Sequence, residues 1–218
     1  MNRPIAKEPM FKSHAIRNFP QLKISLQGIF DQRSEATPVN LSVLLSAIVK
    51  CPAMLKIGLL SDTHGSLNPK AFDFFKDCDE IWHAGDIGLI KVADQLSSFK
   101  TLRAVYGNID GTSIRSQFPE ILVFSAEEVK VLMIHVGGYP GHYPPAIRNL
   151  IAAERPKLFI CGHSHILKVI YDQKVELLHI NPGAAGHSGL HKSITMIRFV
   201  IDRDNIKDLE ILDIPRKT

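Results

Sequence analysis

Short apolar runs rich in β-branched residues recur from residue 54 onward, and each ends in a small group of glycine and polar residues. This pattern is typical of buried strands that lead into functional loops. The runs lie at 57–60, 80–82, 102–105, 131–134, 158–160 and 177–180. We expect these six strands to end near one another, so that the loops that follow them converge on one edge of the fold.

Apolar residues with helical spacing occupy three stretches between strands, at 71–75, 90–99 and 146–154. Pro69 and Pro145 open the first and the last of these helices, because proline is favoured in the first helical turn, and Pro156 ends the last one. The final strands, expected at 193–201 and 206–214, are joined by a hairpin-like turn. Because strands and helices alternate early and strands dominate late, we predict an α/β (α+β) fold, a four-layer αββα sandwich of two mixed β-sheets flanked by helices.

The character of the sequence changes at Met54. Residues 1–53 contain scattered proline, serine, asparagine and basic residues, weak periodicity and no motif. We interpret 1–53 as an N-terminal extension that is poorly ordered or results from a mis-assigned start, and 54–218 as the main domain. In the alternative interpretation, residues 41–48 form a short amphipathic helix that docks on the main domain or on a partner.

Composition excludes several classes of protein. The formal charge of +4 belongs to residues 1–53, which hold seven Lys/Arg and three Asp/Glu, whereas residues 54–218 hold nineteen of each. A neutral main domain without a basic stripe lacks the usual features of a nucleic-acid-binding protein, so we expect no specific nucleic-acid binding. The three cysteines suggest no disulfide framework, and the apolar run at 41–49 is too short to span a membrane. We therefore expect a cytoplasmic protein without membrane insertion.

Side chains that bind metal ions follow several of the expected strands. Asp62 and His64 come after the first strand at a spacing of two, which on an extended segment points both side chains the same way. His163 and His165 repeat this spacing after a later strand, where Gly162 leaves room for an ion. Each pair on its own is modest evidence for a metal site.

Three further residues complete the set, and each also has an ordinary structural interpretation. Asp86 suits a helix N-cap, Asn108 suits a turn, and His135 suits a buried position at a strand end. Seven oxygen or imidazole ligands at the ends of five strands, with no cysteine among them, are hard to obtain from packing alone. We therefore predict a metal site at the strand ends formed by Asp62, His64, Asp86, Asn108, His135, His163 and His165.

The order of these residues resembles that of the calcineurin-like metallophosphoesterases. The matching motifs are Asp62-x-His64, Gly85-Asp86, Gly107-Asn108, His135 and Gly162-His163-Ser164-His165. Within this superfamily the chain looks like the small bacterial and archaeal phosphodiesterases of the YfcE type, to which the retromer scaffold subunit is related. The motifs that carry this narrower likeness are Ser61-Asp62-Thr63-His64-Gly65, His83-Ala84-Gly85-Asp86, Gly107-Asn108-Ile109-Asp110 and Asn181-Pro182-Gly183. The resemblance covers 54–218 and implies a metallophosphoesterase domain.

The resemblance also implies two divalent metal ions per chain. The implied ligands are Asp62, His64 and His165 for one ion and Asn108, His135 and His163 for the other, with Asp86 as the bridge. In this mechanism a metal-bridging hydroxide attacks the phosphorus, and Asp86, Asn108 and His135 are the central catalytic residues. Manganese is the expected metal, and zinc, iron and nickel suit the same ligands.

Two loops depart from the pattern of larger members of the superfamily. Ile109 stands where many phosphatases carry a histidine that protonates the leaving group, and the loop after His135 lacks a second histidine. We expect His142, together with Gly137 and Gly138 of the same loop, to contact the substrate. The alternative is that His142 is an ordinary surface residue.

Two polar residues are expected in a supporting role around the metal ligands. His83 would help to orient Asp86, and its alternative is that of a buried histidine at a strand end. Asn181 follows the strand at 177–180 and would shape the edge of the pocket.

The leading expectation is hydrolysis of a small phosphodiester substrate, because the small relatives favour diesters. One alternative is phosphomonoester or nucleotide hydrolysis at the same site, although the sequence shows no decisive Arg or Lys for the additional phosphate charge. The other is a protein-interaction scaffold like the retromer subunit, with weak or no activity, which the complete ligand set disfavours. The sequence leaves homo-oligomerisation open.

Overall fold

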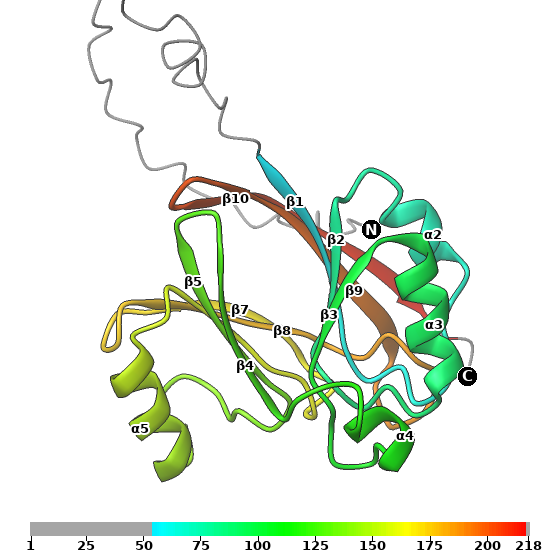
Figure 1. Ribbon diagram of the computed structural model, residues 1–218, viewed down its shortest axis with the longest axis horizontal. Helices are drawn as coiled ribbons and strands as arrows, with labels where there is room; N and C mark the ends of the chain where they lie inside the picture. Colours follow the sequence, from blue (N-terminus) through cyan, green and yellow to red (C-terminus); the bar gives the residue numbers. More distant parts are fainter. Residues whose placement is uncertain (1–53, 217–218) are drawn as a thin grey trace, which may run out of the picture. The chain divides into compact units, whose positions relative to one another are not determined.

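The computed structural model describes residues 54–216. Within this part of the chain, two five-stranded sheets pack against each other, and helices cover their outer faces (Figure 1). The predicted N-terminal extension at 1–53, with its alternative helix at 41–48, lies outside the described residues.

The first sheet, called sheet A, has the strand order β10-β9-β1-β2-β3. Its strands are β1 (Leu55–Leu60), β2 (Glu80–His83), β3 (Thr101–Ala104), β9 (Ser193–Asp202) and β10 (Asn205–Pro215). The strands β1, β2 and β3 are parallel, with Leu60 opposite His83 and His83 opposite Ala104, so their carboxyl ends lie at the same edge. The antiparallel pair of β9 and β10 confirms the predicted hairpin.

The second sheet, called sheet B, has the strand order β4-β5-β6-β8-β7. Its strands are β4 (Ile121–Ala126), β5 (Val129–Ile134), β6 (Leu158–Ile160), β7 (Leu167–Asp172) and β8 (Leu177–Pro182). The central strands β5, β6 and β8 are parallel, and the edge strands β4 and β7 run antiparallel to their neighbours. Both sheets are therefore mixed, as predicted.

The side chains of the central strands alternate between the space that separates the sheets and the helices outside. Ile57 of β1 and Met133 of β5 belong to the core between the two sheets. Leu60 packs on the opposite face of sheet A with α2 and α3, and Leu132 packs on the opposite face of sheet B with α5. The helices are α2 (Lys70–Phe74), α3 (Ile90–Phe99), α4 (Thr112–Arg115) and α5 (Pro145–Glu154). Three apolar layers thus separate four structural layers, which confirms the αββα sandwich.

Three elements were not predicted: β4, β7 and α4. The strands β4 and β7 lie at the two edges of sheet B, where most of their side chains are exposed or half-buried. Their apolar alternation is consequently weak in the sequence. Helix α4 has only four residues, which is too short for a helical period to appear.

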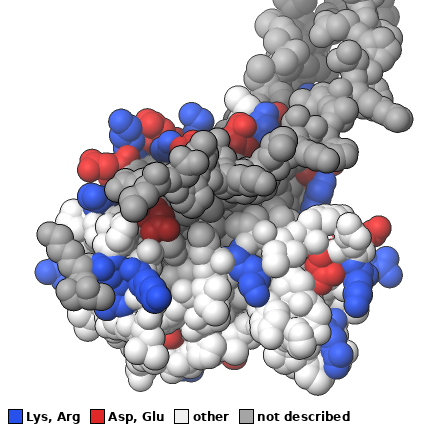
Figure 2. Space-filling view, turned by 180° about the vertical axis from the view of Figure 1, so that it is seen from behind, with Lys and Arg blue, Asp and Glu red and all other residues white. Residues whose placement is uncertain are grey.

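The exterior of the described residues carries both signs of charge. On the face shown in Figure 2, Lys and Arg side chains are interspersed with Asp and Glu, and uncharged residues cover much of the lower part. This mixture agrees with the equal numbers of basic and acidic residues in 54–218. Among residues 54–216, no helix has the length and apolar character required to cross a membrane.

Candidate metal centre

The seven predicted ligands lie in the loops that follow parallel strands of the two sheets. Sheet A supplies Asp62 and His64 after β1, Asp86 after β2, and Asn108 after β3. Sheet B supplies His135 directly after β5, and His163 and His165 after β6. The two sheets meet so that both sets of loops contribute to one region.

Five of these residues have a left-handed backbone, which side chains other than glycine rarely adopt. The φ angles are 55° at Asp62, 47° at His64, 54° at Asp86, 67° at His163 and 56° at His165. Such backbone strain clusters at functional sites, where the surrounding structure holds it in place. The prediction that the two pairs with a spacing of two project from extended segments is therefore wrong, because the loops turn sharply after each strand ends.

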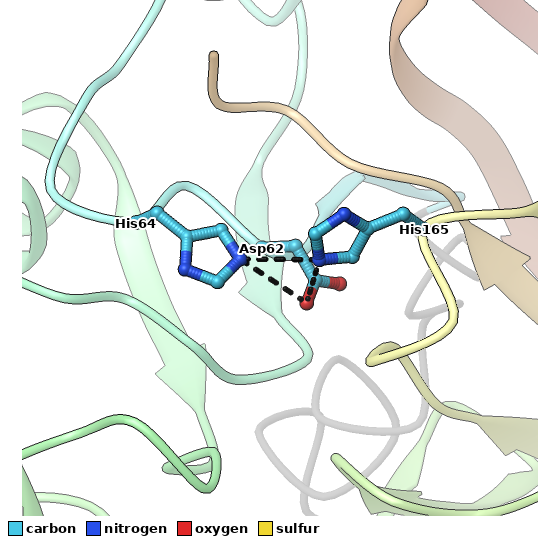
Figure 3. Close-up of side chains that lie close together, drawn as sticks. All are labelled: Asp62, His64 and His165. Carbon is cyan, nitrogen blue, oxygen red and sulfur yellow. Dashed lines mark hydrogen bonds and ion pairs between the residues drawn. The ribbon is translucent and has the colours of Figure 1, made fainter. Parts of the chain in front are cut away.

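Asp62, His64 and His165 form the first cluster (Figure 3). The Nε2 atoms of the two histidines are 3.1 Å apart, and Nε2 of His165 lies 3.2 Å from Oδ1 of Asp62. Nε2 of His64 lies 3.8 Å from the same oxygen. The Asp62 side chain is fully buried, whereas those of His64 and His165 are 17% and 19% exposed. One carboxylate oxygen and two imidazole nitrogens thus face a common centre that solvent reaches from the histidine side.

Asp86, His135 and His163 form the second cluster. Nε2 of His135 lies 3.2 Å from Oδ2 of Asp86, and the rings of His135 and His163 meet edge to face with centroids 5.4 Å apart. His163 and His165, which are two positions apart in the sequence, therefore join different clusters. This division is the one that the family resemblance implies.

The two clusters are adjacent, and the carboxylates of both aspartates reach across them. Oδ2 of Asp86 is 4.0 Å from Nε2 of His64 in the first cluster. Oδ1 of Asp62 is 3.9 Å from Nε2 of His135 in the second. Asp86 therefore lies between the clusters, in the position required of a shared ligand.

Oδ1 of Asp62 and Nε2 of His135 are among the buried atoms that have no hydrogen-bond partner within the described residues. Buried polar atoms are costly when unpaired, so this pair needs an explanation. The other atoms of both side chains are engaged: the backbone N–H of His163 donates to Oδ2 of Asp62 (3.1 Å), and Nδ1 of His135 donates to the carbonyl of Ala84 (2.8 Å). This leaves a carboxylate oxygen and an imidazole lone pair directed into the site. A divalent cation fits such donors.

The electrostatics of the second cluster also favour a bound cation. Burial opposes the charge on Asp86, but the adjacent imidazole of His135 and the backbone N–H of Ile109 hold the pKa of Asp86 below its ordinary value. Burial likewise opposes protonation of His135, but the carboxylates of Asp86 and Asp62 near its ring raise the pKa of His135. Both shifts have the same physical origin, which is that buried carboxylates stabilise positive charge beside them.

Asn108 lies beside the second cluster, on the wall of a hollow that also includes His135. The guanidinium of Arg115 fixes the Asn108 loop by donating to the carbonyl oxygens of Gly107 (3.2 Å) and Asn108 (3.3 Å). A β carbon at Gly107 would collide with the carboxylate of Asp86, so glycine is required for this close approach. The structure thus presents Asn108 next to the second cluster.

His83 links the loops that follow β1 and β2. The backbone N–H of Gly85 donates to Nδ1 of His83 (3.2 Å), so Nε2 carries the proton and donates to Oγ1 of Thr63 (3.0 Å). Thr63 in turn donates to the carbonyl of Ile87 (3.0 Å). Burial lowers the pKa of His83 to about 4, which keeps the ring neutral. His83 therefore holds the backbone on either side of the ligands, and no direct contact with the Asp86 carboxylate is needed for this role.

Asn181 supports the loop that carries the β6 histidines. Its Nδ2 donates to the carbonyl of Gly162 (2.7 Å) and to Oγ of Ser164 (3.1 Å), and its Oδ1 accepts from the N–H of Gly183 (2.9 Å). The side chain is buried. These contacts bracket His163 and fix the direction of its loop.

His142, Gly137 and Gly138 lie in the loop between β5 and α5. The ring of His142 packs against that of Tyr139, with centroids 4.8 Å apart. A β carbon at Gly137 would lie 2.7 Å from the ring of Phe159, and Gly138 has a φ of 75°. Packing and backbone conformation thus explain both glycines, and the substrate contact of this loop stays a prediction.

Asp110 is a residue of the site that the pattern of strand ends does not predict. Its buried carboxylate accepts from the backbone N–H groups of Ile87 (3.1 Å), Gly88 (2.7 Å) and Gly107 (2.8 Å). These bonds join the loop after β2 to the loop after β3. The motif Gly107-Asn108-Ile109-Asp110 is a signal in the sequence, but an aspartate near glycine is typical of any turn.

His191 is another residue of the site that the pattern of strand ends does not predict. Its ring lies against that of His165, with centroids 5.2 Å apart, and its Nε2 lies 3.0 Å from the carbonyl oxygen of Gly186. Burial lowers the pKa of His191 and favours its neutral form. His191 follows no predicted strand, so the pattern of strand ends could not single it out.

Comparisons with known proteins agree with this geometry. The family model of the calcineurin-like phosphoesterase superfamily domain matches residues 55–204. A protein of Methanothermobacter thermautotrophicus, named as a probable metallophosphoesterase, is 30% identical over 133 residues, which are 59% of this chain and 76% of that protein. Vacuolar Protein Sorting 29 from Cryptosporidium parvum is similar with a TM-score of 0.60 and 16% identity, over 75% of this chain and 99% of that one. YfcE, a phosphoesterase from E. coli, is similar with a TM-score of 0.52 and 18% identity, over 72% and 98%.

The two solved structures share the fold of this chain at low sequence identity. The family model spans most of the chain, and the matched residues contain both clusters together with Asn108. The chain therefore belongs to the calcineurin-like phosphoesterase superfamily, a metallophosphoesterase family whose membership implies hydrolase activity and the use of divalent metal.

Proposed function

We propose that this protein hydrolyses phosphodiesters with two divalent cations, one at each cluster. The observation that carries the proposal is the position of Asp86, whose Oδ2 lies 3.2 Å from Nε2 of His135 and 4.0 Å from Nε2 of His64. A carboxylate between two adjacent donor sets suits a bridge between two cations. The proposal extends the shared phosphoesterase family to a particular reaction and mechanism.

Each cation has a defined set of donors in this proposal. The sets are Asp62, His64 and His165 for the first cation, and Asn108, His135 and His163 for the second, with Asp86 common to both. Bound cations of this kind supply Lewis acidity and a nucleophile that is active at neutral pH. Manganese is our first choice, and zinc, iron or nickel suits the same mixture of carboxylate, amide and imidazole.

The protein itself contributes orientation. The carbonyl of Ala84 fixes the tautomer of His135, so the lone pair of Nε2 faces the centre. The N–H of Ile109 donates to Oδ1 of Asp86 (3.1 Å), which leaves Oδ2 for the centre. Both contacts come from backbone groups, which hold the donors in place without moving during the reaction.

Charge distinguishes a diester from a monoester substrate. A phosphomonoester carries an additional negative charge, which calls for cationic side chains around the phosphate. Arg115 lines the hollow beside the second cluster, but its guanidinium is engaged with the carbonyl oxygens of Gly107, Asn108 and Asp110. This favours a diester monoanion over the alternative of monoester or nucleotide hydrolysis.

The structural similarity to Vacuolar Protein Sorting 29 raises an alternative function, which is that of a protein-interaction scaffold. Buried polar atoms without a partner lower the stability of a fold unless a ligand satisfies them. Oδ1 of Asp62 and Nε2 of His135 are such atoms. They support a bound cation, as the enzyme requires, and hydrolysis distinguishes the enzyme from a scaffold that also binds metal.

The substrate in this proposal is a small phosphate ester and the setting is the cytoplasm. Cys78 and Cys161 are buried free thiols, as in a reducing compartment. Neither membrane nor nucleic acid is part of the proposed reaction.

The test is hydrolysis of bis(4-nitrophenyl) phosphate and of 4-nitrophenyl phosphate by metal-loaded protein, with elemental analysis of protein purified without added metal. We expect faster hydrolysis of the diester and two metal equivalents per chain. Asp86→Ala is expected to lower diester hydrolysis about a thousandfold and to lower the metal content. Asp94→Ala, on an exposed position of α3, is the matched control and is expected to change neither.

Each alternative function predicts a different outcome of this test. Diester hydrolysis that survives Asp86→Ala would exclude the two-metal mechanism. Faster hydrolysis of the monoester would favour the monoesterase, and metal binding without hydrolysis of either ester would favour the scaffold.

A further inference from the structure

A hollow of about 650 Å³ opens beside the second cluster, between α5 and the segment that contains α4. Asn108 and His135 lie on its wall, so the hollow begins at the metal centre. None of the roles assigned above to the metal ligands explains a recess of this size.

Three segments build the hollow. The loop after β3 and α4 contribute Tyr106 and Arg115, the strand ends of sheet B contribute Ile121 and Val136, and α5 contributes its first turns. The complete lining is Tyr106, Gly107, Asn108, Arg115, Glu120, Ile121, Ile134, His135, Val136, Pro144, Ala146, Ile147 and Leu150. Most of these side chains are aliphatic or aromatic, and the polar ones are concentrated near Asn108 and around Tyr106.

Two contacts fix Tyr106 in this wall. Its hydroxyl donates to Oε2 of Glu120 (3.0 Å), and the guanidinium of Arg115 lies over its ring at 4.3 Å from the centroid. Arg115 is itself tied to backbone carbonyl oxygens, so the stack of guanidinium on ring is anchored at both ends. Guanidinium groups and aromatic rings both interact favourably with flat rings, so this wall suits a planar group.

The size and chemistry of the hollow fit a ligand group with a ring. Pockets for small molecules span roughly 300–1,000 Å³ and combine apolar walls with a few polar groups. A nucleobase or aryl group fits such a space, whereas a methyl group leaves most of it to water. The hollow opens laterally from His135, on the side of the second cluster where Asn108 lies.

We propose that this hollow binds the unreactive ester substituent of the diester substrate and selects a planar aromatic group, such as a nucleobase or an aryl ring. The proposal rests on the proposed phosphodiesterase function and adds the substrate class. Apolar contact with the walls and stacking near Tyr106 supply the preference. A diester with a small aliphatic substituent has the same phosphate but lacks these contacts.

The kinetic test keeps the leaving group constant. The 4-nitrophenyl esters of methyl phosphate, phenyl phosphate and thymidine 5′-phosphate are compared with metal-loaded protein. We expect kcat/KM for the two aromatic diesters to exceed that for the methyl diester on the order of tenfold or more. The phenyl and thymidine arms distinguish an aryl group from a nucleoside as the preferred ring.

Two variants fill the hollow from opposite walls without touching the metal ligands. Ala146→Trp acts from α5 and Ile121→Trp from the start of β4, and both positions are exposed, so folding is preserved. Ala153→Trp is the control, because Ala153 is an exposed residue of the same helix outside the lining. We expect both filling variants to lower kcat/KM for the aromatic diesters to about that of the methyl diester and so to remove the preference, while the control keeps the preference.

Equilibrium binding gives a readout that does not depend on turnover. Calorimetry with diphenyl phosphate and dimethyl phosphate is expected to show tighter binding of the diphenyl ester, and Ala146→Trp is expected to remove the difference. Equal rates or equal affinities for aromatic and methyl diesters in the unmodified protein would overturn the proposal. If no diester is hydrolysed at all, the proposed function fails, and the calorimetric comparison still decides whether the hollow selects aromatic esters.

Discussion

The two sheets contribute different donors to the same centre. Sheet A supplies the oxygen donors Asp62, Asp86 and Asn108 along with His64, whereas sheet B supplies imidazoles alone. The side chains that hold the ligand loops in place also differ between the two sheets. The sheet A loops are joined by the carboxylate of Asp110 and by neutral His83, and the sheet B loop is held by the amide of Asn181. The negative charge of the carboxylates thus comes from sheet A, and most of the nitrogen ligands come from sheet B.

Each side orients a ligand of the opposite side. The carbonyl of Ala84, in a sheet A loop, accepts from His135 of sheet B. The N–H of His163, in a sheet B loop, donates to the carboxylate of Asp62 of sheet A. Neither set of loops therefore has its observed geometry without the other. We infer that a bound metal would join the two sheets and would stabilise the whole sandwich.

The largest expected effect tests whether donors from the two sheets act as one unit. Asp62→Ala and His165→Ala remove the two sides of the first cluster. We expect each to lower kcat/KM for bis(4-nitrophenyl) phosphate about a thousandfold, and the double variant to lose little more than either single one, because residues that act together are non-additive. Multiplied losses in the double variant would show that the two sheets act independently, and Asp94→Ala serves again as control.

Removal of metal is the next largest effect. A ligand that binds only the folded state adds about 4 kcal/mol of stability at a thousandfold excess over its Kd. For a chain of this size that corresponds to a fall in Tm of about 8 °C or more on chelation. Calorimetric scans with and without chelator measure it. Asp86→Ala is expected to show a much smaller shift, and an unchanged Tm in the unmodified protein would contradict metal binding across the sheets.

The supports of the two sides can be compared directly. Asp110→Ala leaves the three N–H groups of Ile87, Gly88 and Gly107 without their acceptor, and we expect it to lower the free energy of unfolding by about 3 kcal/mol. Asn181→Ala removes the same number of bonds, but they are bonds of a neutral amide and not of a carboxylate, so we expect about 2 kcal/mol. Urea unfolding of the metal-free proteins gives both values. A larger loss for Asn181→Ala would reverse the ranking of the two sides.

Two buried histidines, one in each sheet, are expected to make the stability of the fold sensitive to acid. Burial lowers the pKa of His83 in sheet A to about 4 and, with the charge of Lys168, that of His179 in sheet B to about 4. The unfolded chain takes up the proton near its ordinary pKa of 6.5, so the folded state loses stability as the pH falls from 6.5 toward 4. We expect each histidine to account for about 2 kcal/mol of this loss between pH 7 and pH 5.

Substitution of the same histidines sharpens the comparison. Both nitrogens of His83 are engaged with Thr63 and Gly85, whereas Nδ1 of His179 has no partner among the described residues. We therefore expect His179→Phe to reduce the acid sensitivity of the metal-free protein at little cost at pH 7, and His83→Phe to reduce it only with a loss of stability at pH 7. Urea unfolding at the two pH values measures both. Equal losses at pH 7 would refute the distinction.

Much of the fold is present in the amphipathic pattern of the chain. Central strands such as β1 and β5 alternate between two apolar layers, so their positions are visible in the sequence, and α3 and α5 have a clear helical period. The edge strands β4 and β7 bury few side chains and leave little periodic signal. The periodicity of a sequence reflects how deeply an element is buried, so edge strands of a sheet are the hardest elements to predict.

The sequence by itself determined which donors end the strands, and the order of those donors identified the family. Spacing along the chain suggests that His163 and His165 face the same way, although the family resemblance assigns them to different ions. Tertiary structure supplies the physical cause of the division, because left-handed turns direct the two side chains to different clusters. It also determined the contacts that Asp110 and His191 make and formed the hollow beside Asn108. The physical reason is that periodicity records local burial, while the meeting of two sheets and the loops between them depends on long-range packing.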